Sequence, residues 1–174
     1  MLNIVFSRHH NHNHREIDWH TVILFTLGFW LSGSFVLDFV LIPSLSLTGM
    51  MGSDEFAYVG FVLFGIFNRV EMICASLILT ATLVEGTQHH FTARKQQSAV
   101  IFATILLLIS LAYTYIFTPN LTAWGLCLDQ FNTTRPLSVN MILWHSGYWL
   151  LEGLKYALAV TLLRWNYRNG CLSR

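Results

Sequence analysis

Charged and polar residues lie inside a long apolar stretch in the first half of the chain. The segment 67–71 reads FNRVE and sits in the middle of the apolar run 56–84. A charged side chain near a bilayer centre costs at least about 2.5–3.5 kcal/mol, so it is expected to face protein or water. Asn68 and Glu71 are three residues apart and share one helix face, whereas Arg69 points about 100° away from Asn68. These residues predict either a polar clamp between helices or a site for a substrate, proton or cofactor.

A second set of polar residues recurs at helical spacing in the last apolar stretch. His145, Trp149, Glu152 and Tyr156 follow one another at intervals of four, three and four residues, and Lys155 is adjacent. This spacing places them on one face of a helix. A polar stripe of that length needs a bundle interior or a water-filled groove. The stripe is therefore a candidate functional face.

Four long apolar stretches position these groups. Charged residues make up 11% of the chain, against about 25% in ordinary soluble domains, which indicates a membrane protein. We predict an all-α, polytopic fold with four transmembrane helices in an up-down bundle. The expected helices cover about 21–45, 56–84, 98–118 and 138–163, within a transmembrane domain at 20–164 that follows a polar, His-rich N-terminal tail at 1–19 and precedes a short basic C-terminal tail at 165–174.

The distribution of basic residues predicts the orientation of the bundle. In a four-span chain both termini and the middle loop lie on one side of the membrane. Seven basic residues occupy those three segments, and only Arg135 lies in the two connections on the other side. The positive-inside rule therefore puts both termini in the cytoplasm. The seven are Arg8, Arg15, Arg94, Lys95, Arg164, Arg168 and Arg174.

Depth along the helices suggests which polar groups meet. A helix rises about 1.5 Å per residue, so residues at equal depth in neighbouring spans can be matched. On this basis, residues on the first and second helices are level with residues of complementary charge on the fourth helix. We predict three pairs: Asp38 with His145, Arg69 with Glu152, and Glu71 with Lys155. With Asn68, these residues form the predicted intramembrane polar cluster.

Histidines offer two candidate ligand sites. His145 is the histidine placed well inside the membrane, so it is a candidate axial ligand for a haem or a chlorophyll, or a satisfied histidine bonded to Asp38. Alternating histidines in the N-terminal tail can also chelate a transition metal, because imidazole nitrogen is a common ligand. An ordinary solvated tail is the alternative for that segment. The tail histidines are His9, His10, His12 and His14.

Other features exclude several functions. The cysteines Cys74, Cys127 and Cys171 fall in the membrane and on opposite sides of it, so no intramolecular disulfide is expected. The net charge of +1 and the lack of a basic stripe argue against nucleic acid as a partner. No Ser-His-Asp order, P-loop or HExxH motif is present, so we expect a protein that is not an enzyme.

Particular segments resemble a known group of proteins. These are GFWLSG at 28–33, DFV at 38–40, Pro43, and FNRVE at 67–71. Together they resemble uncharacterised small four-helix integral membrane proteins of cyanobacteria and plastids, and more distantly CopD-like four-helix membrane families. The resemblance spans the first two expected helices. It implies the four-helix fold and a photosynthetic membrane.

The leading functional prediction is a non-enzymatic membrane protein that acts by binding. It would be an assembly factor or an accessory subunit of a larger membrane complex, for which the resemblance suggests a photosynthetic one. Its partners would be the lipid bilayer and other membrane subunits, in a plasma (inner) membrane or a thylakoid membrane. Two alternatives remain open. One is a haem- or chlorophyll-binding bundle using His145; the other is a small carrier or proton-coupled protein using Arg69, Glu71, Glu152 and Lys155.

Overall fold

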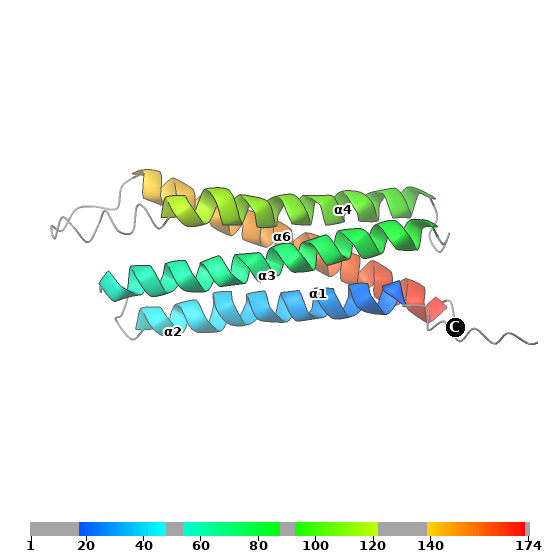
Figure 1. The fold of residues 1–174 in the computed structure, drawn as a ribbon, viewed down its shortest axis with the longest axis horizontal. Helices are drawn as coiled ribbons and strands as arrows, with labels where there is room; N and C mark the ends of the chain where they lie inside the picture. The colour runs from blue at the N-terminus through cyan, green and yellow to red at the C-terminus, as the bar shows by residue number, and fades with distance from the viewer. Residues whose placement is uncertain (1–17, 48–53, 88–92, 122–138, 173–174) are drawn as a thin grey trace, which may run out of the picture.

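Long helices make up the regular structure of the protein. The computed structural model describes residues 18–47, 54–87, 93–121 and 139–172. Figure 1 shows α1, α3 and α4 running along a common axis, while α6 crosses them diagonally, so that one end of α6 lies near α4 and the other near the start of α1. The elements are α1 (Trp19–Phe35), η1 (Val36–Leu41), α2 (Ile42–Leu47), α3 (Asp54–Thr87), α4 (Ala93–Ala112), η3 (Tyr113–Phe117) and α6 (Val139–Leu172).

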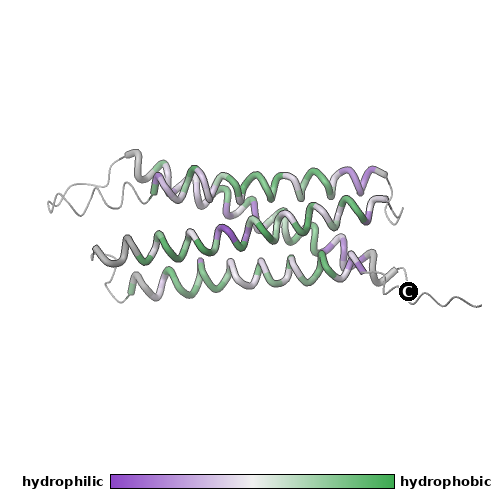
Figure 2. Tube along the Cα trace, in the orientation of Figure 1, coloured by the Kyte–Doolittle hydropathy of each residue, from purple (hydrophilic) through white to green (hydrophobic). Residues whose placement is uncertain are grey.

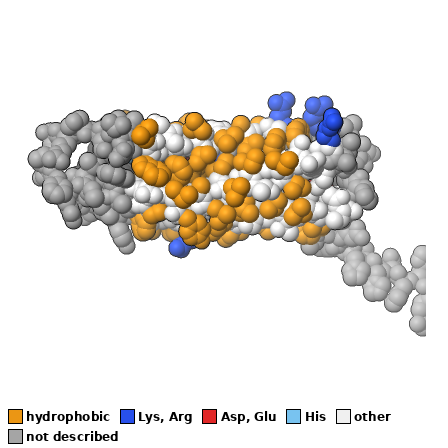
Figure 3. Space-filling model, turned by 90° about the horizontal axis from the view of Figure 1, so that it is seen from above, with side chains coloured by type: hydrophobic (Ala, Val, Ile, Leu, Met, Phe, Trp, Pro, Cys, Tyr) orange, Lys and Arg blue, Asp and Glu red, His pale blue; other side chains and the backbone are white. Residues whose placement is uncertain are grey.

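Three segments are long and apolar enough to cross a membrane. They are Trp19–Ser44, Val59–Thr87 and Arg94–Leu121. The described residues thus confirm an all-helical fold with three candidate membrane-spanning helices, and a fourth span in α6 stays a prediction. Figure 2 shows these helices hydrophobic over most of their length, with hydrophilic residues partway along α3. On the face drawn in Figure 3, hydrophobic side chains are spread over the described surface, while basic side chains lie at its edges, mainly near one end.

Two helices widen into π-helical turns shortly before a proline. In η1 the backbone N–H of Ile42 donates to Leu37, five residues back, and Pro43 follows directly. In η3 the N–H of Thr118 donates to Tyr113, and Pro119 follows. Because proline lacks an N–H and its ring crowds the carbonyl four residues back, the regular ladder cannot continue unchanged through it. Both wide turns carry a buried polar residue toward α6, Asp38 in η1 and Tyr113 in η3.

The last helix is longer than the sequence predicted. We expected it to end near residue 163, with a tail at 165–174, but α6 continues to Leu172. No proline or glycine interrupts the chain between Arg164 and Asn169. Tertiary contacts also hold the added turns, since the Trp165 ring stacks on Phe102 with centroids 5.3 Å apart. The predicted end of this helix near residue 163 is therefore wrong.

The hydrophobic core occupies the half of the bundle nearer the start of α1. There Ile23, Leu27, Ile78, Leu106 and Leu162 are at most 1% exposed. Small side chains line α3 and α4, which lets these two helices approach closely. The core therefore packs on one side of the polar residues described next. The small side chains are Ala75, Ala81, Ala99 and Ala103.

Candidate functional site

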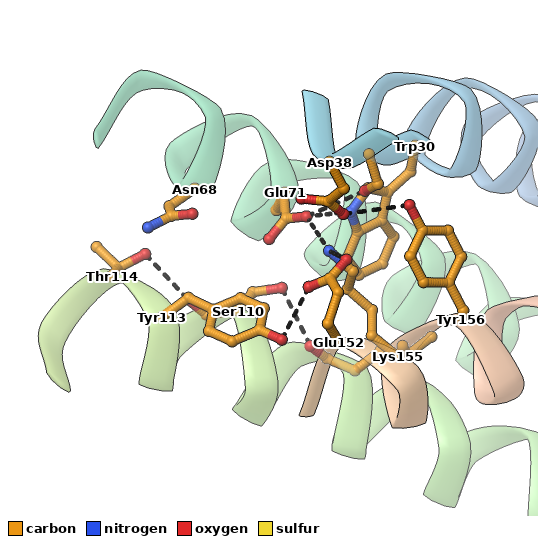
Figure 4. Close-up of polar contacts among 12 residues, drawn as sticks. Trp30, Asp38, Asn68, Glu71, Ser110, Tyr113, Thr114, Glu152, Lys155 and Tyr156 are labelled. Carbon is orange, nitrogen blue, oxygen red and sulfur yellow. Dashed lines mark hydrogen bonds and ion pairs between the residues drawn. The ribbon is translucent and has the colours of Figure 1, made fainter. Parts of the chain in front are cut away.

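Four ionisable side chains meet in the interior of the bundle, and we call them the Lys155 cluster. They come from three different parts of the chain: Asp38 in η1, Glu71 in α3, and Glu152 with Lys155 in α6. None is more than 3% exposed. Figure 4 shows the three carboxyl groups gathered around the lysine ammonium. Burying charged groups this completely is unfavourable unless they are paired and hydrogen-bonded.

Glu71 is the most heavily bonded acid of the cluster. Its Oε1 atom lies 2.6 Å from Lys155 Nζ and forms a buried ion pair with it. Trp30 Nε1 donates to the same oxygen at 3.0 Å, and Ser34 Oγ donates to it at 3.2 Å. Its other oxygen, Oε2, is buried and has no hydrogen-bond partner. One oxygen of Glu71 thus receives three donors while the other receives none.

Glu152 and Asp38 form the other side of the cluster. Glu152 Oε1 lies 2.6 Å from Lys155 Nζ, and Tyr113 donates from its hydroxyl to Glu152 Oε2 at 2.9 Å. Asp38 contributes the third carboxyl group on this side of the cluster (Figure 4). Tyr156 donates to Asp38 Oδ2 at 3.3 Å. The ammonium of Lys155 thus lies between two glutamates.

Aromatic rings enclose the cluster. The ammonium of Lys155 lies 5.4 Å from the ring centroid of Tyr113 and 5.7 Å from that of Tyr156, which allows cation–π attraction to both rings. Tyr113 also packs against Tyr148, with centroids 5.0 Å apart. In this low-dielectric surrounding, hydrogen bonds and ion pairs are stronger than in water, and an unpaired charge is costlier.

The predicted pairing of Glu71 with Lys155 is present, and that of Arg69 with Glu152 is wrong. Arg69 is exposed on α3, and Glu152 is bonded instead to Lys155 and Tyr113. The reason is the direction in which each side chain points around the axis of α3. Arg69 and Glu71 are two residues apart, so their side chains point about 200° from each other around the helix. When Glu71 faces the bundle interior, Arg69 must face outward.

The predicted pairing of Asp38 with His145 is also wrong. Asp38 accepts from Tyr156 instead, and Tyr156 is eleven residues beyond His145, or about 16 Å along α6. The depth estimate assumed helices parallel to one axis, whereas α6 crosses the bundle diagonally (Figure 1). Equal residue counts therefore do not give equal heights.

The remaining candidate residues lie apart from the cluster. Asn68 is buried and donates from Nδ2 to Thr118 Oγ1 at 2.6 Å, one turn from Glu71. The side chain of His145 is exposed on α6, so binding of a haem or chlorophyll there stays a prediction. Within the described part of the chain, no group of three or more His, Cys, Asp or Glu is arranged to hold a metal ion. The tail histidines His9, His10, His12 and His14 lie outside the described residues.

Sequence reasoning missed three residues that complete the site. Trp30, Ser34 and Tyr113 all donate to the glutamates of the cluster. A signal was available for two of them, because a buried indole N–H or phenol O–H in an apolar helix normally finds a partner. No such signal marked Ser34, since serine in a membrane helix can also bond its own backbone.

Comparison with known proteins identifies neither a family nor a function for this site. No protein-family model matches the chain, and no curated protein and no solved structure is significantly similar to it. The chemistry of the site rests on its own residues. Three acids and one lysine, joined by phenol, indole and hydroxyl donors, can hold helices together and can bind and release protons.

Proposed function

We propose that this protein is a non-enzymatic integral membrane protein that serves as an accessory subunit or assembly factor of a larger membrane complex. In this proposal α6 is a fourth span, the helices form an up-down bundle, and both termini lie on the cytoplasmic side. The Lys155 cluster then lies within the membrane and ties α1, α3 and α6 into one body. The observation that carries the proposal is the position of Arg69.

Arg69 stands alone in an apolar stripe on the outside of α3. Val62, Ile66 and Ile73 are 40%, 58% and 60% exposed, and with Arg69 they follow intervals of four, three and four residues. Residues at that spacing lie along one helix face, which is the pattern of a helix-packing seam. Among the residues described, none forms an ion pair with Arg69. The stripe therefore presents a single cation on a surface otherwise suited to lipid or another helix.

The depth of Arg69 calls for a partner. It lies ten residues, or about 15 Å, beyond Val59, the first residue of this candidate span. An arginine at such depth is unfavourable against lipid and favourable against a carboxylate, with which it forms bidentate bonds. The proposed occupant of the stripe is a transmembrane helix of another protein that carries an Asp or Glu level with Arg69.

A second copy of this chain fits the stripe poorly. The acidic side chains described within its long helices are all at most 5% exposed: Asp38, Glu71, Glu85 and Glu152. The described surface of a second copy packed on the stripe would therefore offer no exposed carboxylate to pair with Arg69 at that depth. Charge complementarity thus favours a partner of different sequence. The resemblance to cyanobacterial and plastid proteins directs the search to photosynthetic membranes, thylakoid or plasma.

Site-specific cross-linking in the native membrane tests the proposal. A photo-reactive amino acid replaces Ile73 in the stripe, and in a control replaces Phe25 on α1, which is 77% exposed. We expect Ile73 but not Phe25 to capture one membrane protein, and Arg69→Leu to abolish that capture. The matched charge control is Arg168→Leu, which removes an exposed arginine near the end of α6.

Charge exchange then decides whether the captured protein is the partner. Arg69→Glu should break the complex, and replacing the facing carboxylate of the captured helix by Arg should restore it. Adducts with lipid only, capture of a second copy only, or failure of the exchange to restore binding would each overturn the proposal.

A further inference from the structure

Four polar side chains continue the interior of the bundle beyond the hydrophobic core, and we call them the end layer. Figure 1 shows the start of α1, the end of α3, the start of α4 and the end of α6 together at one end of the molecule. Each side chain is three or four residues from a core residue of its own helix, and residues at that spacing share one helix face. The end layer is His20, Glu85, Gln96 and Asn166, and the core residues one turn away are Ile23, Ala81, Ala99 and Leu162.

The two amides of the end layer have their oxygens buried and unbonded. Asn166 is 3% exposed and donates from Nδ2 to the carbonyl of Leu162 at 2.9 Å. Gln96 donates from Nε2 to the carbonyl of Thr82 at 2.6 Å. Because a carbonyl oxygen can accept only from the NH₂ group, these bonds fix the direction of each amide. Asn166 Oδ1 and Gln96 Oε1 are therefore left without a hydrogen-bond partner in the described part of the chain.

An imidazole and a carboxyl group complete the end layer. His20 Nε2 is buried and has no hydrogen-bond partner among the described residues. Glu85 is 5% exposed and lies in the turn of α3 that Gln96 contacts, since a Cβ on Gly86 would meet the Gln96 side chain. A buried polar atom left unbonded is unfavourable by about 1–3 kcal/mol. Unbonded atoms on α1, α4 and α6 thus mark a place where a bound species would stabilise the bundle.

The chemistry of the end layer suits a metal cation. Imidazole nitrogen suits transition metals, and carboxylate and carbonyl oxygens suit Mg²⁺, Ca²⁺ and Mn²⁺, so Mn²⁺ is the ion that fits both kinds of ligand. A single water molecule has only two hydrogens to donate, fewer than the acceptors gathered here. The helices also form a closed ring of contacts, α1 with α3, α3 with α4, α4 with α6, and α6 with α1. Ligands that converge from four sides enclose a small ion better than the head group of a lipid.

We propose that the end layer is a binding site for a divalent metal cation of the Mn²⁺ type. The site contains one histidine and one glutamate with two amides, so it differs in kind from a cluster of three or more His, Cys, Asp or Glu. The cation would join all four helices on the side of the hydrophobic core opposite the Lys155 cluster. Its ligands are His20 Nε2, the Glu85 carboxylate, Gln96 Oε1 and Asn166 Oδ1.

Binding of Mn²⁺ to the full chain, produced without a histidine tag, tests the proposal. Electron paramagnetic resonance separates bound from free Mn²⁺ and detects nitrogen bonded to the ion. We expect one bound Mn²⁺ per chain with nitrogen coupling, and Asn166→Leu should weaken binding at least about tenfold. The matched control is Asn120→Leu, because Asn120 also donates from Nδ2 to the carbonyl four residues back but lies near the other end of the span Arg94–Leu121.

Further variants identify the nitrogen ligand and separate binding from folding. His20→Gln should remove the nitrogen coupling. Thermal unfolding gives a second readout, because a ligand that binds the folded state raises the melting temperature. Mn²⁺ should raise it for the wild type and for Asn120→Leu, but not for Asn166→Leu. Replacing the tail histidines by Gln should leave affinity and coupling unchanged; these are His9, His10, His12 and His14.

The same measurements can overturn the proposal. A wild-type chain that binds no Mn²⁺, or binds it without nitrogen coupling, would leave the end layer to water. Loss of binding in the variant without tail histidines would assign the ion to the tail. Equal affinities for the wild type and Asn166→Leu would indicate an adventitious ion only. Because the first result needs only the wild-type protein, it remains decisive even if a variant fails to fold.

Discussion

Lys155 Nζ lies 2.6 Å from Glu71 Oε1, although the two residues are 84 positions apart in the chain. This ion pair joins α3 to α6, and Trp30 extends it to α1 by donating to the same oxygen. A single carboxylate oxygen is thus the point at which three helices meet. The predictions below test how strongly this arrangement holds the bundle together.

Lys155→Met should be among the most destabilising single substitutions in the chain. It leaves Glu71 and Glu152 buried without their shared cation, and removing one member of a buried ion pair costs about 3–5 kcal/mol. Thermal unfolding in one detergent gives the comparison. The control Lys95→Met removes an exposed lysine of α4 and should leave stability nearly unchanged. Equal melting temperatures for the two variants would show that the pair contributes nothing.

Tyr113→Phe should destabilise the protein by about 1.5–3 kcal/mol, the range for a hydrogen bond to a charged partner. The substitution removes the hydroxyl that donates to Glu152 Oε2 at 2.9 Å and keeps the ring. Tyr115→Phe is a matched control, because Tyr115 belongs to the same π-helical turn and is 68% exposed. Chemical denaturation of both variants measures the difference, and a larger effect at Tyr115 would contradict the assignment.

Gly86→Ala should weaken the contact between α3 and α4. A Cβ at this position would meet the side chain of Gln96, whose Nε2 donates to the backbone carbonyl of Thr82 at 2.6 Å. Moving Gln96 breaks that bond, at about 0.5–1.5 kcal/mol. Gly60→Ala, with open space around its Cβ, should instead gain up to about 1 kcal/mol from helix propensity. Unfolding curves that show both glycines gaining stability would disprove the Gln96 contact.

Asp18 should make the start of α1 sensitive to acid. Its carboxylate accepts from the Thr21 hydroxyl at 2.6 Å and from the Thr21 N–H at 3.4 Å. The hydroxyl bond is the main reason that the pKa of Asp18 lies below its ordinary value of 3.8. A lowered folded-state pKa means that this stabilisation is present above about pH 4 and is lost as the pH falls further.

Hydrogen exchange at the first turn of α1 measures this effect. Asp18→Ala should raise exchange there at neutral pH, since loss of an N-cap costs about 1 kcal/mol. Asp18→Asn should keep most of the cap and remove its pH dependence. Persistence of the acid effect in Asp18→Asn would assign it to another group.

Much of the polar site could be predicted from sequence because buried charges in apolar helices are conspicuous. Asp38, Glu71, Glu152 and Lys155 were all identified, and they do cluster. Their partners were predicted less well. Depth along a helix follows from residue counting, but rotation about the helix axis and the tilt of α6 do not. These two factors explain why the predicted partners of Arg69 and His145 were wrong.

The sequence by itself predicted the class of this protein, an all-helical chain with long apolar segments, and three of its four expected spans are candidate membrane spans in the described residues. Hydrophobicity and length suffice for that conclusion because a helix satisfies its own backbone hydrogen bonds. Tertiary structure alone decided that Glu71 Oε1 accepts from Lys155, Trp30 and Ser34, and that Asp38 accepts from Tyr156. Those contacts depend on how four helices rotate and cross, and that arrangement is set by packing among residues far apart in the chain.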